Sequence, residues 1–229
     1  MPRLAFIAVA PFFLVPLSAA ETQSYDLPEF NALSVSAGIE LEFAAGAPQS
    51  VTVENADNDF DDIKLSVRDG MLDIERPRRF GINLDRPRYK VTVTAPVLSH
   101  LDVSSGADAV GTGLSGPDVS VEVSSGSNAN VSAIDGGRVD LETNSGADLI
   151  ASGSCEEIHA ETSSGSDLDA SELICATGRA EASSGSDLSI HARQAAQAEA
   201  SSGADIHIHG APETVRQDTS SGGDVMVHS

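Results

Sequence analysis

The stretches 158-IHAETSSGSDLDA-170 and 178-GRAEASSGSDLSI-190 are close copies of each other, and 139-VDLETNSGADLIA-151 follows the same pattern. In each stretch the word Ser-Ser-Gly, or Asn-Ser-Gly, separates two runs in which apolar and polar residues alternate. The word recurs every 18 to 20 residues, with its glycine at Gly106, Gly126, Gly146, Gly165, Gly185, Gly203 and Gly222. Such a period is typical of a solenoid, whose repeats stack on one another.

The residues around each glycine keep the same register. An acid stands four residues before it: Asp102, Glu122, Glu142, Glu161, Glu181, Glu199 and Asp218. A small polar residue stands two residues after it: Asp108, Asn128, Asp148, Asp167, Asp187, Asp205 and Asp224. Because apolar and polar positions alternate on both sides, each copy predicts two short strands around a glycine bend.

A repeat of this length without a helical pattern cannot bury its apolar face alone, whereas parallel copies stacked about 4.8 Å apart bury a thin continuous core. We therefore expect an all-β parallel β-helix, or β-solenoid, with seven coils over residues 96–229. Residues 21–95 lack the repeat but contain strand patterns and the hairpin signal Asp69-Gly70. We expect this segment to cap the first coil, so that residues 21–229 form one structural domain.

Residues 1–20 predict a cleaved export signal. Arg3 precedes an apolar run from Leu4 to Leu17, and three small residues follow it at positions 18–20. The run is shorter than the roughly 20 apolar residues that a membrane-spanning helix needs. No second apolar run follows, so we expect an exported chain without a transmembrane segment, located in the periplasm, on the cell surface or outside the cell.

The charge balance narrows the classes of partner. Thirteen Lys and Arg residues stand against 35 Asp and Glu residues, which gives a formal net charge of −22. Such a surface repels nucleic acid and anionic lipid and favours cations or basic proteins. No aromatic residue follows Tyr89, so the repeats offer no stacking platform for bases or sugars.

The acidic columns have two interpretations. Carboxylates about 4.8 Å apart on neighbouring coils repel each other by about 1 kcal/mol even at the dielectric constant of water. The columns are therefore either a solvated acidic face that keeps the solenoid soluble, or a ladder that holds Ca²⁺ between adjacent coils. The candidate Ca²⁺ ligands are Asp148, Asp167, Asp187, Asp205, Glu142, Glu161, Glu181 and Glu199.

Four histidines near the C-terminus form a second candidate cluster. His191, His209 and His228 each stand six residues after a repeat glycine, and His207 precedes His209 by two residues on the same face. Imidazoles at this spacing either remain solvated or bind a transition metal such as Zn²⁺, Ni²⁺ or Cu²⁺.

The two cysteines share one register position. Cys155 and Cys175 each stand ten residues before a repeat glycine, so they lie on neighbouring coils. This separation and an exported chain predict a disulfide, and two buried free thiols are the alternative.

Paired carboxylates on a β-helix also suggest a polysaccharide-active enzyme, because glycosidases use two such groups. Here, however, the acids recur in every coil, whereas an active site is a local exception to a repeat. We therefore expect a protein that is not an enzyme. The sequence assigns it no cofactor, and Ca²⁺ is the one candidate.

Three blocks of sequence, residues 30–39, 65–74 and 96–106, occur in an order that resembles the putative auto-transporter adhesin head GIN domain, a bacterial family. The resemblance covers roughly residues 30 to 210. It implies an exported, right-handed β-helix-like domain for which adhesion is proposed, and it brings no catalytic residues. We accordingly expect an adhesin-like binding or structural module with an envelope or surface partner, able to self-associate through the strand Val225–Val227.

Overall fold

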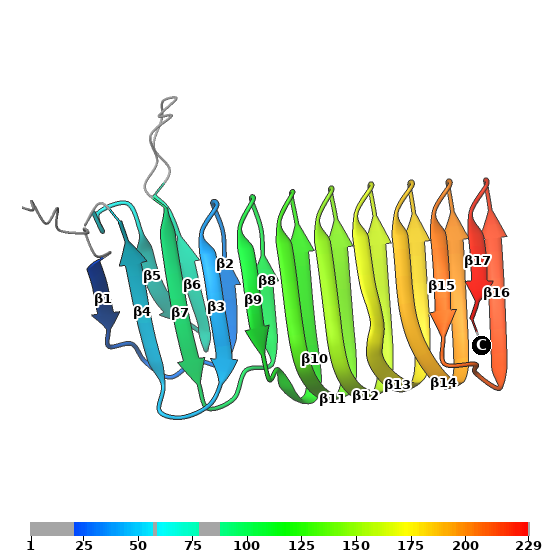
Figure 1. The fold of residues 1–229 in the computed structure, drawn as a ribbon, viewed down its shortest axis with the longest axis horizontal. Coiled ribbons are helices and arrows are strands. Elements are labelled where there is room, and N and C mark those ends of the chain that lie inside the picture. Colours follow the sequence, from blue (N-terminus) through cyan, green and yellow to red (C-terminus); the bar gives the residue numbers. More distant parts are fainter. Residues whose placement is uncertain (1–20, 57–58, 78–87, 229) are drawn as a thin grey trace, which may run out of the picture.

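The protein is built from strands alone in the part of the chain that the structure describes. In this computed structural model those residues are 21–56, 59–77 and 88–228, so the predicted export signal lies outside them. Figure 1 shows strands stacked side by side into a flat coil, with the turns in one row along one edge. The expected all-β solenoid is confirmed. No helix in the described ranges is long and apolar enough to cross a membrane.

The solenoid has two layers of parallel strands. The pre-tip layer contains the strand segments that precede each repeat glycine, and the post-tip layer contains those that follow it. The strands of this region are β8 (His100–Val103), β9 (Asp108–Thr112), β10 (Ser115–Ser124), β11 (Asn128–Asn144), β12 (Asp148–Ser163), β13 (Asp167–Ser183), β14 (Asp187–Ser201), β15 (Asp205–His209), β16 (Thr214–Ser220) and β17 (Asp224–Val227). Equivalent positions of successive coils pair in register, as Glu142 with Glu161 and Asp148 with Asp167 do.

The four strands β11 to β14 are longer than the sequence pattern predicts. Each has 15 to 17 residues and runs from one tip to the next, through both layers. The pairing continues around the bend opposite the tips and is interrupted only by register shifts, such as the one between Val131 and Ile134. The bend is therefore a bulged part of a continuous strand, not a break between two short strands.

The core lies between the two layers and is narrow. In β10 to β15 inward side chains alternate with outward ones, and the inward Leu141 and Leu149, for example, are fully buried. Towards the C-terminus the pre-tip positions become alanines such as Ala160 and Ala180, which let the layers approach closely. Two buried threonines replace apolar residues, but Thr143 Oγ1 donates to Thr162 Oγ1 at 2.8 Å, so these hydroxyls are satisfied.

The tips are tight turns with left-handed backbone. Both the second serine and the glycine have positive φ at all seven tips, for example 60° at Ser164 and 65° at Gly165. This pair of conformations is that of a type I′ turn. A Cβ at any of the seven tip glycines would meet nothing within 4 Å, so glycine is favoured here by its conformation and not by lack of space.

The N-terminal segment contains a coil that the repeat search does not find. Strands β2 (Ala32–Val35) and β3 (Glu40–Ala45) flank Ala37 and Gly38, whose φ values of 63° and 68° match those of the other tips. These strands pair in parallel with β8 and β9. The sequence conceals this coil because Ser34 stands where the other copies have an acid, and Ala37 where they have serine.

The remaining N-terminal strands lie beyond this coil. They are β1 (Glu21–Tyr25), β4 (Ser50–Asn55), β5 (Lys64–Arg68), β6 (Met71–Glu75) and β7 (Tyr89–Ala95). On the side away from β8 and β9, β2 pairs with β6 and β3 with β7, so the chain places the β2–β3 coil between later strands. β4 pairs antiparallel with β1 on one side and with β7 on the other, and β5 and β6 form the hairpin that Asp69-Gly70 predicts.

Candidate functional site

The acids that precede the tips form one straight column on the outer surface of the pre-tip layer. Glu122, Glu142, Glu161, Glu181 and Glu199 occupy equivalent positions on consecutive coils. Four of them, Glu142, Glu161, Glu181 and Glu199, line a shallow groove of about 340 Å³ together with neighbouring serines, and the groove extends as far as Asp218. The groove presents a row of carboxylates and hydroxyls at the spacing of the strands.

Cationic side chains on the same surface neutralise part of this column. Arg179 Nε donates to Glu181 Oε1 at 2.5 Å, and Arg179 Nη2 donates to Glu199 Oε1 at 3.1 Å. The hydrogen bond from Arg179 is the largest cause of a pKa of Glu181 below its ordinary value. Glu181 is therefore firmly ionised at neutral pH, and the alternation of Arg179 with the acids relieves their repulsion.

One histidine lies beside the column, and it was not singled out from the sequence. His159 Nδ1 is 3.5 Å from Asp140 Oδ1, while Nε2 is 3.1 Å from Glu161 Oε1 and 3.6 Å from Glu181 Oε1. His, Cys, Asp and Glu side chains can bind metal ions. Among the described residues, one group of three such side chains has its ligand atoms within 4.8 Å of one another, and it consists of His159, Glu161 and Glu181. The sequence could have indicated this histidine. His159 stands six residues before Gly165 and two before Glu161, so the strand alternation places it on the same outer face as the acids.

The aspartates that follow the tips form a separate column. Asp148, Asp167, Asp187 and Asp205 pair in register in the post-tip layer. Since the inward residues of both layers pack into the shared core, the two acidic columns point away from each other. The eight candidate Ca²⁺ ligands thus divide into two groups of four, and Ca²⁺ binding between coils stays a prediction for each group.

The C-terminal histidines do come together. His207 Nδ1 lies 2.9 Å from His228 Nε2, and the ring of His228 stacks on that of His209 with centroids 4.8 Å apart. His191 pairs in register with His209. Burial, followed by the neighbouring histidines, lowers the pKa of His209, so its imidazole tends to be neutral and able to bind a metal. Transition-metal binding at this cluster stays a prediction.

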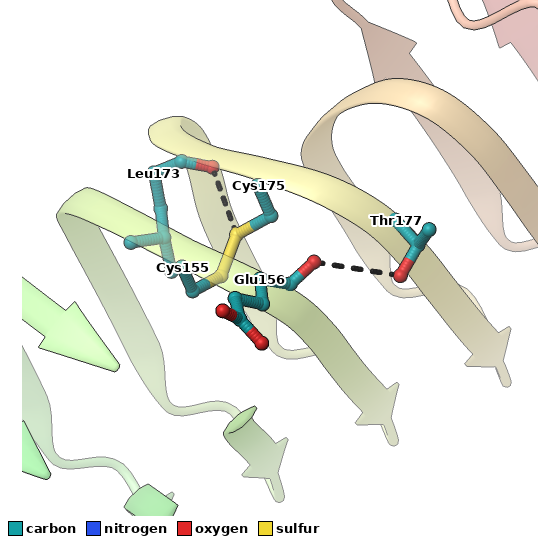
Figure 2. The surroundings of a disulfide bond; sticks show 5 residues. All are labelled: Cys155, Glu156, Leu173, Cys175 and Thr177. Carbon is teal, nitrogen blue, oxygen red and sulfur yellow. Dashed lines mark hydrogen bonds between the residues drawn. A yellow bond between two sulfur atoms is a disulfide. The ribbon is translucent and has the colours of Figure 1, made fainter. Parts of the chain in front are cut away.

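The predicted disulfide is confirmed. Cys155 and Cys175 pair in register on β12 and β13 and are bonded, with their Cα atoms 4.5 Å apart. Figure 2 shows that Cys175 Sγ also faces the carbonyl of Leu173, at 3.5 Å, while Thr177 Oγ1 donates to the carbonyl of Glu156 on the neighbouring strand. The bond therefore ties together the two coils that carry His159, Glu161 and Glu181.

Comparison with known proteins identifies a matching family and solved structures of similar fold. The sequence profile of a family described as "Putative auto-transporter adhesin, head GIN domain" matches residues 29–212. A putative adhesin from Bacteroides fragilis is similar in structure, with a TM-score of 0.83, 16% identity, and coverage of 93% of this chain and 99% of that chain. No curated protein matches the sequence.

Two further solved structures are similar at lower scores. A putative adhesin from Parabacteroides merdae has a TM-score of 0.71, 15% identity, and coverage of 93% of this chain and 98% of that chain. A putative lipid binding protein from Parabacteroides distasonis has a TM-score of 0.70 with the same identity and coverage. At these identities the likeness establishes the fold alone.

Proposed function

This chain belongs to the putative auto-transporter adhesin head GIN domain family, and we propose that it is an exported, adhesin-like module that binds its partner through the acidic column of the pre-tip layer without catalysis. The partner is a basic surface of the cell envelope or of another cell. The observation that carries the proposal is the unbroken column from Glu122 to Glu199, which repeats one charge at the strand spacing along a flat face.

A repeated flat face suits binding because it offers many equivalent weak contacts. Each exposed ion pair contributes only about 0.2–1 kcal/mol, but several in a row act together with a high effective concentration. The formal net charge of −22 also steers positively charged partners towards the protein. Affinity should therefore depend on the number of carboxylates and should fall as salt screens them.

The same repetition argues against catalysis on this face. A glycosidase pair needs one carboxyl group that is protonated and one that is ionised, which requires two different environments. Along this column the carboxylates share one register position on strands of the same layer, and Arg179 keeps Glu181 ionised. We therefore assign binding, not hydrolysis, to the column.

Export is the second part of the proposal. Its support is the sequence of residues 1–20, in which Arg3 precedes an apolar run and three small residues follow it at positions 18–20. Expression of the full chain in a Gram-negative host should yield a periplasmic or released product whose mass corresponds to a chain that begins at Glu21. A product that keeps residues 1–20 and stays in the cytoplasm would contradict export.

Binding can be tested with beads coated with the purified protein and with cells of the source organism that lack this gene. Wild-type beads should adhere at physiological salt and detach at high salt. Beads that carry E142Q/E161Q/E181Q/E199Q should lose adhesion, because four of the five carboxylates of the column are neutralised. The matched control D148N/D167N/D187N/D205N removes the same number of charges from the opposite column and should adhere like the wild type. Equal adhesion of all three proteins, or of none, would refute the proposal.

A further inference from the structure

We propose that His159, Glu161 and Glu181 bind one divalent transition metal ion, with Zn²⁺ as the best fit, on the outer face of the pre-tip layer. The three side chains come from two neighbouring coils, since His159 and Glu161 lie on β12 and Glu181 lies on β13. This site is separate from the charge-based binding of the whole column, because it depends on one imidazole at one place in the repeat.

The spacing of the ligand atoms suits a tetrahedral ion. Zn²⁺ binds nitrogen and carboxylate oxygen at about 2.0–2.2 Å, so that its ligand atoms lie about 3.3 Å apart. The distances from His159 Nε2 to Glu161 Oε1 and Glu181 Oε1, 3.1 and 3.6 Å, lie on either side of that value. Small movements of the exposed Glu161 and the half-buried Glu181 would therefore bring the ligand atoms to this spacing.

The imidazole nitrogen that faces the carboxylates lacks a partner of its own. His159 Nε2 has no contact with solvent and makes no hydrogen bond, although Glu161 Oε1 is near. A neutral imidazole with its proton on Nδ1 would turn a lone pair towards two carboxylates, which also offer only lone pairs. With this tautomer, a metal ion between the three lone pairs would neutralise the two carboxylates and give Nε2 a partner.

Outer partners hold two of the ligands, as they do in known metal sites. Asp140 Oδ1 lies 3.5 Å from His159 Nδ1, and Arg138 in turn holds Asp140 through Nε and Nη2. This is the carboxylate–histidine arrangement that fixes the imidazole tautomer and raises the basicity of the ligand. Arg179 Nε donates to Glu181 Oε1, the oxygen that faces His159 Nε2, and a carboxylate oxygen has a further lone pair with which to bind the ion.

The donor set favours zinc over calcium. Ca²⁺ takes six to eight oxygen ligands, whereas this site supplies one nitrogen and two carboxylates. Imidazole suits Zn²⁺ and its neighbours in the first transition row. The other histidine at this register position, His100, is hydrogen-bonded to Ser120 and carries no comparable set. The site is thus a local exception within the repeat.

Titration of Zn²⁺ into the metal-stripped protein at neutral pH, followed by calorimetry, tests the proposal. The wild type should bind an ion that millimolar Ca²⁺ does not displace. H159Q should weaken this binding at least tenfold, and D140N should weaken it by roughly ten- to a hundredfold, the range found for outer partners of metal ligands. D167N/D187N, on the opposite column, is the matched control and should bind like the wild type.

Two further arms separate this site from the C-terminal histidines and from a purely electrostatic role of His159. H209Q/H228Q should keep the binding that H159Q loses, and anomalous scattering at the zinc edge from wild-type crystals should place the ion beside His159. Equal Zn²⁺ binding by the wild type and H159Q would overturn the proposal, as would loss of binding in H209Q/H228Q alone. Absence of any binding by the wild type would also overturn the proposal.

Discussion

Reduction of the Cys155–Cys175 disulfide should destabilise the protein by an amount set mainly by chain entropy. The bond joins residues 20 positions apart, one complete coil. Closing a loop of this length lowers the conformational entropy of the unfolded chain by about 11 cal/mol/K. At room temperature this corresponds to a stabilisation of the folded protein by about 3 kcal/mol. In a chain of this size, 1 kcal/mol shifts the melting temperature by roughly 2–4 °C, so reduction should lower it by about 6–12 °C.

The assay is urea unfolding of the oxidised protein, the reduced protein and C155A/C175A. The reduced protein keeps all packing atoms and isolates the effect of the covalent bond. The alanine pair also loses the sulfur atoms of the buried Cys175 and of the partly buried Cys155, which packs against the core, so it should be less stable than the reduced protein. The unfolded, unreduced protein should take up no alkylating reagent.

Two results would refute this reasoning. A stability difference well below 1 kcal/mol between oxidised and reduced protein would mean that neighbouring coils stay associated in the unfolded chain, so that the bond restricts nothing. Two alkylated cysteines in the unreduced protein would show that the bond does not form in solution.

Three more predictions concern the glycine turns, the protonation of His209 and self-association through the last coil. G165A should cost about 1 kcal/mol, because only its φ of 65° opposes alanine, whereas G153A should cost several times more, since its Cβ would lie 2.1 Å from the carbonyl oxygen of Ile134; equal costs in chemical denaturation would contradict this. Because burial and the neighbouring histidines hold the pKa of His209 below its usual 6.5, the unfolded chain binds that proton more tightly, and stability should fall as pH drops below that value; melting curves of H209Q should show a smaller decline, and an identical decline would refute the assignment. The edge formed by β16 and β17 should pair two copies of the chain, M226P should shift the dimer towards monomer in sedimentation, and a wild type that stays monomeric at high concentration would exclude this pairing.

The sequence alone determined the features that depend on local conformation and on the neighbour one period away. The alternation around Gly165 and Gly185 specifies strands, and the Ser-Gly pair specifies a turn, because both are properties of a few adjacent residues. Once the tips are in register, every residue faces the residue one period later. That is sufficient to place Cys155 against Cys175 and to align the acids in columns, as the structure confirms.

Only the tertiary structure decided the features that the period does not encode. The β2–β3 coil pairs with β8 and β9 across some 60 residues of intervening chain, and its altered tip, with Ala37 and Gly38, leaves no repeated word to find. The division of the acids between two faces depends on whether the strand segment that carries them belongs to the pre-tip or the post-tip layer. The convergence of His159, Glu161 and Glu181 depends on side-chain geometry across two coils. Differences of about an ångström decide whether their three ligand atoms can reach one metal ion. Repetition fixes backbone register, but it does not fix the rotamers that bring the three donors together or the long-range order in which the coils are stacked.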